Sequence, residues 1–176
     1  MSASRGFFGI GVEGISKPMN VGNLLRSAHS FGASFFFTIA TPIDLYGMRA
    51  SDTSDAFGHL PFYNFARHED IILPQNTAMV AVELTEDAVE LPSFRHPLRA
   101  VYVLGREMGS VSPEMQARCE HVIKIPMKFC VNVGVAGALV MYDRLISLGR
   151  FAPRPVMAGG PRDFAPQNLS PEQVIV

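Results

Sequence analysis

The sequence predicts an α/β domain built on a mostly parallel sheet, with helices on both faces of that sheet. Short β-rich apolar runs alternate along the chain with helix-like segments, which is typical of this class. The chain has 176 residues, of which 48% are hydrophobic and 18% are charged. It is therefore long enough to bury one core and too apolar to be disordered.

The first half of the chain contains the patterns of three strands and two helices. Strands are predicted over residues 7–13, 34–40 and 61–65, and a short helix over 51–58. A longer helix is predicted over 18–31, with Asn20 as its N-cap and Gly32 at its end. Its apolar face consists of Leu24, Leu25, Ala28 and Phe31.

The second half continues the alternation. Strands are predicted over 78–84, 100–104 and 121–125, and a weak helix over 86–89. The triplet Ser112-Pro113-Glu114 combines a capping hydroxyl, a proline and an early carboxylate, so it predicts a helix that runs to about Cys119. A long helix is predicted over 132–148 and ends at Gly149.

The last part of the chain has a different composition. From Phe151 onward, five prolines and the pair Gly159-Gly160 interrupt any helix or strand pattern. We therefore expect a domain over residues 1–150 and a Pro/Gly-rich C-terminal extension over 151–176.

Composition limits the partners and the compartment. Fifteen Lys and Arg against sixteen Asp and Glu give a net charge of -1, so any nucleic-acid binding must depend on a local patch. The start of the chain lacks a secretion signal, and the apolar run over 131–142 is shorter than the ~20 residues that span a bilayer. We expect a soluble cytoplasmic protein without a membrane segment, in which Cys119 and Cys130 are plain thiols and the histidines bind no metal.

One familiar motif is a false lead. Gly9, Gly11 and Gly14 match the G-x-G-x-x-G dinucleotide fingerprint, whose glycines should follow a strand and open a helix. Here Gly9 and Gly11 lie inside the first predicted strand and Gly14 directly follows it, and no acidic residue ends the second strand. The sequence therefore argues against a nicotinamide or flavin site.

Three other stretches place polar residues next to strand ends or helix starts. Asn20 is followed by Arg26, the strand over 100–104 leads through Gly105 to Glu107, and a proline loop leads to Asn132 and a helix start rich in small residues. Open α/β sheets bind ligands at such carboxyl edges. Each stretch also has a plain reading: a helix cap with a solvated arginine, a turn before a surface glutamate, and tight helix packing against the sheet or a partner subunit.

Together, the order and spacing of the three stretches resemble the TrmH-like (SpoU) branch of the SPOUT RNA 2′-O-ribose methyltransferases, over roughly residues 7–149. The family motif Asn-x-Gly-x-x-x-Arg is similar to Asn20, Gly22 and Arg26. Leu-Gly-x-Glu before a Ser-Pro-Glu-like helix start is similar to 104–107 and 112–114. Ile-Pro-Met followed by Ser-Leu-Asn-Val-Ser is similar to 125–127 and 130–134, although Cys130 and Gly134 replace the serines and the loop before Asn132 is shorter.

The resemblance implies the fold, the cofactor and the site. It implies a deep C-terminal trefoil knot that holds S-adenosyl-L-methionine (AdoMet), a homodimer with the site near the subunit interface, and no metal. The implied catalytic residues are Asn20, Arg26, Glu107 and Asn132. The implied cofactor-binding residues are Leu84, Gly105, Ile125, Met127 and Val133.

The implied reaction accounts for these residue types. A ribose 2′-hydroxyl is a poor nucleophile, so the site must align it with the methyl donor and favour the developing alkoxide. Arg26 suits an electrostatic role better than that of a base, because its guanidinium keeps its proton. Compact members of the family usually act on tRNA, and the candidate phosphate contacts are Arg5, Lys17, Arg26, Arg106, Lys124 and Lys128.

Two alternatives stay open. The chain could be a catalytically degenerate knotted dimer that acts as an RNA-binding or assembly module, with Cys130, Gly134 and the short loop as the lost parts. It could instead methylate a base nitrogen of RNA. The second alternative ranks lower, because SPOUT branches with that activity lack the pattern from Asn20 to Arg26.

Overall fold

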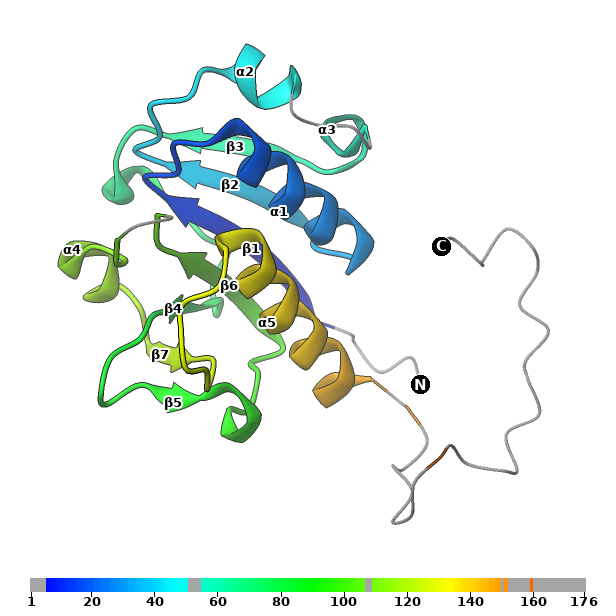
Figure 1. Cartoon of the computed structure of the whole chain (residues 1–176), viewed down its shortest axis with the longest axis vertical. Helices are drawn as coiled ribbons and strands as arrows, with labels where there is room; N and C mark the ends of the chain where they lie inside the picture. Colours follow the sequence, from blue (N-terminus) through cyan, green and yellow to red (C-terminus); the bar gives the residue numbers. More distant parts are fainter. Residues whose placement is uncertain (1–5, 51–54, 107–108, 150, 152–158, 160–176) are drawn as a thin grey trace.

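The computed structural model describes residues 6–50, 55–106, 109–149, 151 and 159. Its centre is a seven-stranded sheet of order β3-β2-β1-β6-β4-β7-β5, shown in Figure 1. All pairings in this sheet are parallel, which confirms the predicted fold class. The strands are β1 (Phe7–Glu13), β2 (Phe35–Ile39), β3 (Phe62–Phe65), β4 (Ala78–Val82), β5 (Val89–Glu90), β6 (Arg99–Leu104) and β7 (His121–Lys124).

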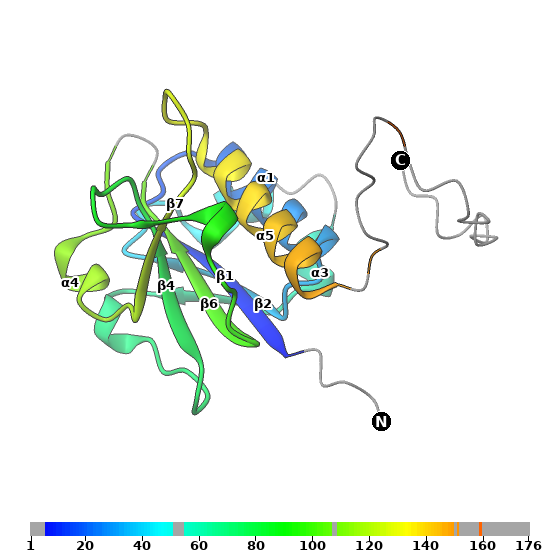
Figure 2. The ribbon, with the colours of Figure 1, turned by 90° about the horizontal axis from the view of Figure 1, so that it is seen from below.

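Helices cover both faces of the sheet. The described helices are α1 (Pro18–Ser30), α2 (Leu45–Ala50), α3 (Ala56–His59), α4 (Pro113–Gln116) and α5 (Val133–Leu148), with short 3₁₀ turns at His68–Asp70 and Leu91–Ser93. The two long helices, α1 and α5, lie side by side on one face, and α4 lies away from them (Figures 1 and 2). None of the described helices is long and apolar enough to cross a membrane.

Two apolar clusters hold these layers together. The first lies between the sheet and the pair α1 and α5, and it includes the fully buried Ile10, Leu24 and Val140. The second lies on the opposite face, where Met115 of α4 packs with residues such as Val101. Alternate residues of the buried strands therefore serve different clusters, as expected for a sheet that is covered on both faces.

The glycines of β1 have a packing role. A Cβ atom on Gly9 would overlap the ring of Phe35, and one on Gly11 would overlap the ring of Phe37. Both rings belong to β2, whose residues pair with these glycines. The G-x-G-x-x-G pattern thus leaves room for aromatic side chains from the neighbouring strand.

The prediction that Asn20 caps α1 is wrong. The helix begins at Pro18, and Lys17 occupies the N-cap position without a side-chain hydrogen bond to the helix. Proline is favoured in the first turn because its fixed φ suits the helix and it has no N–H to satisfy. Asn20 therefore lies inside the first turn, where it is only 7% exposed.

Other differences concern short elements. The helix predicted over 86–89 is wrong: residues 86–87 form a turn, and Val89–Glu90 pair with β7 as the edge strand β5. The helix predicted over 51–58 is found only at Ala56–His59, and 51–54 lie outside the described residues. The unpredicted α2 follows Asp44, whose carboxylate accepts a hydrogen bond from the Gly47 N–H at 2.6 Å.

Candidate active site at the carboxyl ends of the strands

The predicted site residues gather at one edge of the sheet. Because the strands are parallel, their carboxyl ends meet there, and the segments that follow β4, β6 and β7 begin there. Leu84 follows β4, Gly105 follows β6, and Ile125 and Met127 follow β7. Both α1 and α5 also begin at this edge, so the two long helices add their first turns to it.

Asn132 joins two of the three sequence motifs. It is the N-cap of α5, because its Oδ1 accepts a hydrogen bond from the Gly134 N–H at 2.8 Å. Its Nδ2 donates to Oδ1 of Asn20 at 3.0 Å, across 112 residues of sequence. Asn20 is buried and Asn132 is exposed, so the pair links the interior of α1 to the surface at the start of α5.

Small residues in the first turns of α5 allow this contact. A Cβ on Gly134 would lie 3.1 Å from Oδ1 of Asn132 and 3.3 Å from Cβ of Asn23, and one on Gly137 would overlap the side chain of Leu24. These small residues therefore do allow tight helix packing, but the main packing partner is α1, whereas the plain reading named the sheet or a partner subunit. The same close approach lets Asn132 reach Asn20.

The other two predicted catalytic residues, Arg26 and Glu107, lie outside this hydrogen-bonded pair or outside the described residues. Arg26 lies further along α1 with an exposed side chain. Among the described residues, no hydrogen bond or ion pair links Arg26 to Asn20 or Asn132. Glu107 lies outside the described residues, and its catalytic role stays a prediction.

Two carboxylates that the sequence did not single out hold the loop after β6. Glu83 follows β4, and its Oε1 accepts from the Leu84 N–H at 2.9 Å while its Oε2 accepts from the Val111 N–H at 2.7 Å. Glu13, the last residue of β1, accepts from the Ser112 N–H at 2.8 Å and from the Ser112 hydroxyl at 2.7 Å. The sequence marks these two residues only by their position, since each is an acidic residue at the carboxyl end of a buried strand.

The same loop is compact around Gly105. A Cβ on Gly105 would lie 2.7 Å from the Val111 nitrogen, so a side chain there would push the end of the loop away. Ser112 then caps α4, because its Oγ accepts from the Met115 N–H at 3.1 Å. This cap confirms the predicted helix start, although α4 ends at Gln116 rather than near Cys119.

Some predicted surface cations have other partners. The Lys124 ammonium group donates to the backbone carbonyls of Thr85 and Glu86 at 3.1 and 2.9 Å, so it fastens the loop after β4. These bonds occupy two of the three N–H donors of the ammonium group, and the assignment of Lys124 as a phosphate contact stays a prediction. Arg106 and Lys128 are exposed near the same edge, whereas Arg5 lies outside the described residues.

The cysteines and histidines were the candidate metal ligands of the sequence. Within the described ranges, no group of three or more His, Cys, Asp or Glu side chains is arranged to hold a metal ion. Burial raises the pKa of the Cys119 thiol to about 12, and this thiol donates to the Met115 carbonyl at 3.3 Å. Cys130 is exposed and carries a free thiol, so both are plain thiols as predicted.

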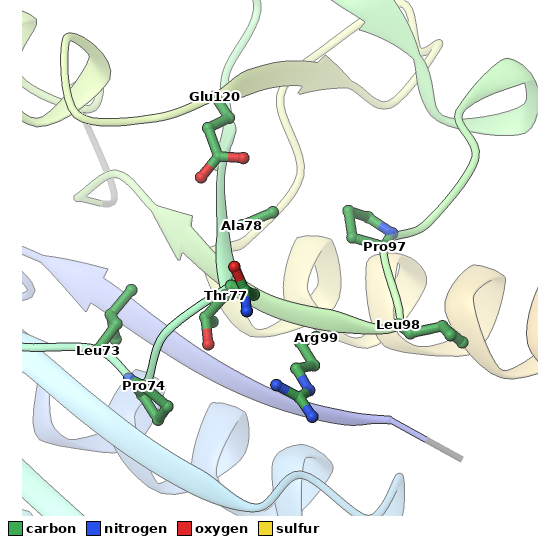
Figure 3. Close-up of a pocket in the computed structure, with 9 residues that line it drawn as sticks. Leu73, Pro74, Thr77, Ala78, Pro97, Leu98, Arg99 and Glu120 are labelled. Carbon is green, nitrogen blue, oxygen red and sulfur yellow. The ribbon is translucent and has the colours of Figure 1, made fainter. Parts of the chain in front are cut away.

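An open cavity of about 930 Å³ lies at the opposite edge of the sheet, near the amino ends of β4 and β6 (Figure 3). Thr77 and Ala78 line one side of it, and Leu98 and Arg99 line another. None of the predicted site residues borders this cavity. The cavity and the asparagine pair therefore lie at opposite edges of the sheet.

Comparison with known proteins identifies a family and a shared fold. The model of the SpoU rRNA methylase family matches residues 8–142. No curated protein matches the sequence. Similar solved structures include the SpoU methyltransferase AviRb from Streptomyces viridochromogenes in complex with AdoMet (18% identity, TM-score 0.73, covering 82% of this chain and 62% of that one).

Two further structures share the fold. One is an AdoMet-bound rRNA methyltransferase from Sinorhizobium meliloti (21% identity, TM-score 0.70, covering 83% of this chain and 58% of that one). The other addresses the 2-OH methylation of C/U34 on tRNA (23% identity, TM-score 0.69, covering 81% of this chain and 91% of that one). The chain spans about three fifths of the length of the AviRb and Sinorhizobium proteins and nine tenths of the third.

Proposed function

Because the chain belongs to the SpoU rRNA methylase family, we propose that it transfers a methyl group from AdoMet to a ribose 2′-hydroxyl of RNA, with a tRNA as the substrate. The observation that carries this proposal is the hydrogen bond between Asn20 and Asn132. Two motifs that are far apart in sequence meet through it at the ligand-binding edge of a parallel sheet.

The residues at this edge fit an adenosyl ligand. Such a ligand needs apolar contacts and a few polar groups that fix its orientation. The Leu84 side chain is 47% exposed, and Ile125 and Met127 are partly exposed beside it in the sheet order. Next to Leu84, the hydroxyl of Thr85 is buried and has no hydrogen-bond partner among the described residues. Buried polar groups are normally hydrogen-bonded, so this hydroxyl could bond to a ligand.

The proposed cofactor site therefore consists of residues from three loops and one helix. Leu84, Gly105, Ile125 and Met127 would supply apolar contacts and backbone groups around the adenosyl moiety. Val133, which is buried at the start of α5, would support them from beneath. When bound, AdoMet supplies an electrophilic methyl group on its sulfonium.

The proposed catalytic residues act on the RNA. The Arg26 guanidinium stabilises the developing alkoxide at the 2′-oxygen, because it keeps its positive charge throughout. The hydroxyl proton would pass to a phosphate of the RNA as the 2′-oxygen bonds the methyl carbon and the sulfonium–methyl bond breaks, which would leave a neutral thioether. Asn20, Glu107 and Asn132 position the ribose, Arg26 and the amino group of the cofactor.

A homodimer is part of the proposal. Val135, Leu139, Tyr142 and Leu145 form an apolar stripe along α5, and each is between 40% and 49% exposed. A contiguous apolar stripe at helical spacing is typical of a surface that packs against another protein. A second copy on this stripe would also bring residues of its own close to the start of α5, where Asn132 lies.

Two observations support tRNA as the substrate. The chain covers 91% of the fold-sharing structure that addresses tRNA methylation, and it covers much less of the longer rRNA methyltransferases. Arg106 and Lys128 are exposed near the proposed site and can contact phosphates.

Three other features stay predictions. They are the division into a domain over 1–150 and an extension over 151–176, the trefoil knot, and the cytoplasmic location.

The test is a binding titration followed by a transfer assay. Calorimetric titration with AdoMet and its demethylated product measures cofactor affinity, and tritiated-methyl transfer to tRNA from cells that lack the gene measures turnover. We expect Arg26→Ala to abolish transfer while the AdoMet affinity is kept. Arg99→Ala, which removes an equal charge at the opposite edge of the sheet, is the matched control and should leave transfer unchanged.

The outcomes separate the remaining functions. Digestion of the product to nucleosides and mass spectrometry distinguishes a 2′-O-methyl group from a methylated base. Absence of AdoMet binding would refute the methyltransferase and favour a knotted dimer that binds or assembles RNA. Binding of AdoMet without transfer to tRNA would refute the tRNA assignment alone.

A further inference from the structure

Glu83 connects the two loops on which the proposed cofactor site depends. Its one carboxylate accepts the Leu84 N–H, from its own loop, and the Val111 N–H, from the loop that begins at Gly105. The backbone of Glu83 is itself fixed, because its N–H donates to the Ile123 carbonyl at 2.9 Å. The side chain is therefore held between strand β7 and the end of the loop after β6.

Two other charged side chains, Glu13 and Lys124, each hold one of these two loops. Glu13 holds Ser112, the next residue along, so two carboxylates fix two consecutive backbone N–H groups. Lys124 holds the other side of the loop after β4 through the carbonyls of Thr85 and Glu86. Of these three charged groups, only Glu83 bonds to both loops.

We propose that Glu83 is a positioning residue for the cofactor: its carboxylate sets the spacing between Leu84 and Gly105. This inference rests on the proposed function, since it assumes that both residues line the adenosyl pocket. Gly105 is the sensitive point, because Val111 lies against the position of its missing side chain. If the Val111 N–H is released, the loop around Gly105 loses the contact that keeps it closed toward Leu84.

Only a glutamate meets these requirements. A carboxylate is an acceptor on both oxygens, so it satisfies two N–H donors at once. A glutamine would present its own NH₂ group to one of the two N–H groups, and an aspartate would be one methylene too short. Hydrogen bonds to a charged acceptor are also stronger than those to a neutral one.

The experiment compares Glu83→Gln with Glu90→Gln in the full chain. Glu90 is exposed on β5, and no side-chain contact of it is seen in the described structure, so the control removes the same charge without breaking the connection. We expect Glu83→Gln to weaken AdoMet binding about tenfold, the effect of losing one charge-assisted hydrogen bond. At saturating AdoMet, methyl transfer should stay close to that of the unchanged protein.

A second readout separates positioning from folding. Hydrogen exchange should become faster at the amides of Leu84 and Val111 in Glu83→Gln, while the amides in the middle of β4 and β6 keep their protection. A variant that loses thermal stability but binds AdoMet as tightly as Glu90→Gln would overturn the proposal. If the unchanged protein binds no AdoMet at all, the proposed function itself fails, whatever Glu83 does.

Discussion

His96 and Asp143 lie 47 residues apart and meet at 2.9 Å, between Nε2 of the imidazole and Oδ2 of the carboxylate. The other ring nitrogen of His96 lies 2.6 Å from the hydroxyl of Tyr102. Since the carboxylate can only accept, Nε2 carries the proton, and Nδ1 accepts from the tyrosine. This buried contact fastens α5 to the segment that precedes β6 and to β6 itself.

The His96 contact predicts a loss of stability in mild acid. Burial is the main cause that lowers the pKa of His96, and it outweighs the raising effect of Asp143. The unfolded chain therefore takes up a proton at a higher pH than the folded protein, so stability is full above about pH 6.5 and falls as the pH drops below it. Urea unfolding at pH 7.5 and 5.5 should show a larger acid loss for the unchanged protein than for His96→Gln, and equal losses would contradict this.

Arg144, the neighbour of Asp143, predicts a large effect of a single substitution. Its guanidinium is buried, donates to the carbonyls of Pro97 and Leu98 at 2.6 and 2.9 Å, and lies over the ring of Phe8. Arg144→Met should lower the free energy of unfolding by about 3 kcal/mol, because buried carbonyl groups lose charged donors. Arg99→Met, on an exposed arginine, should change it by less than about 0.5 kcal/mol in the same urea experiment.

Most strands of the sheet could be predicted from the local sequence, but the edge strand β5 could not. The short apolar runs around Ile10, Tyr102 and Ile123 are rich in β-branched and aromatic residues, so they predict strands that are buried on both faces of a parallel sheet. The edge strand Val89–Glu90 has no such run and forms only because β7 offers free backbone groups. Its short sequence carries a weak local preference, which tertiary pairing overrides.

The glycines of β1 predict a graded effect on stability. Phe37 is fully buried, whereas Phe35 is only partly buried, and each ring occupies the space next to one glycine. Gly11→Ala should therefore destabilise the protein by about 2 kcal/mol, since a buried ring must move within a packed core. Gly9→Ala should cost clearly less in the same thermal unfolding experiment, because Phe35 can shift toward solvent. Equal costs would mean that the rings are not the reason for the glycines.

The site was predictable as a set of motifs and not as a network. Asn132 could be placed at a helix start because its cap is local, and small residues after it signalled close packing. The contact with Asn20 depends on how α1 and α5 cross, which no local pattern specifies. The role of Glu83 was hidden for the same reason, since its partner Val111 lies 28 residues away across the sheet edge.

Asn132 predicts that capping and positioning can be separated. Asn132→Asp keeps an oxygen for the Gly134 N–H, so α5 should stay capped and the melting temperature should change little. The aspartate cannot donate to Oδ1 of Asn20, and two oxygens would then face each other across that contact. Methyl transfer should fall at least about tenfold, as expected when a positioning contact is lost. Asn132→Ser also caps well and also lacks the amide group, so it should lose methyl transfer without adding a charge. Full activity in either variant would show that the asparagine pair serves only to join the helices.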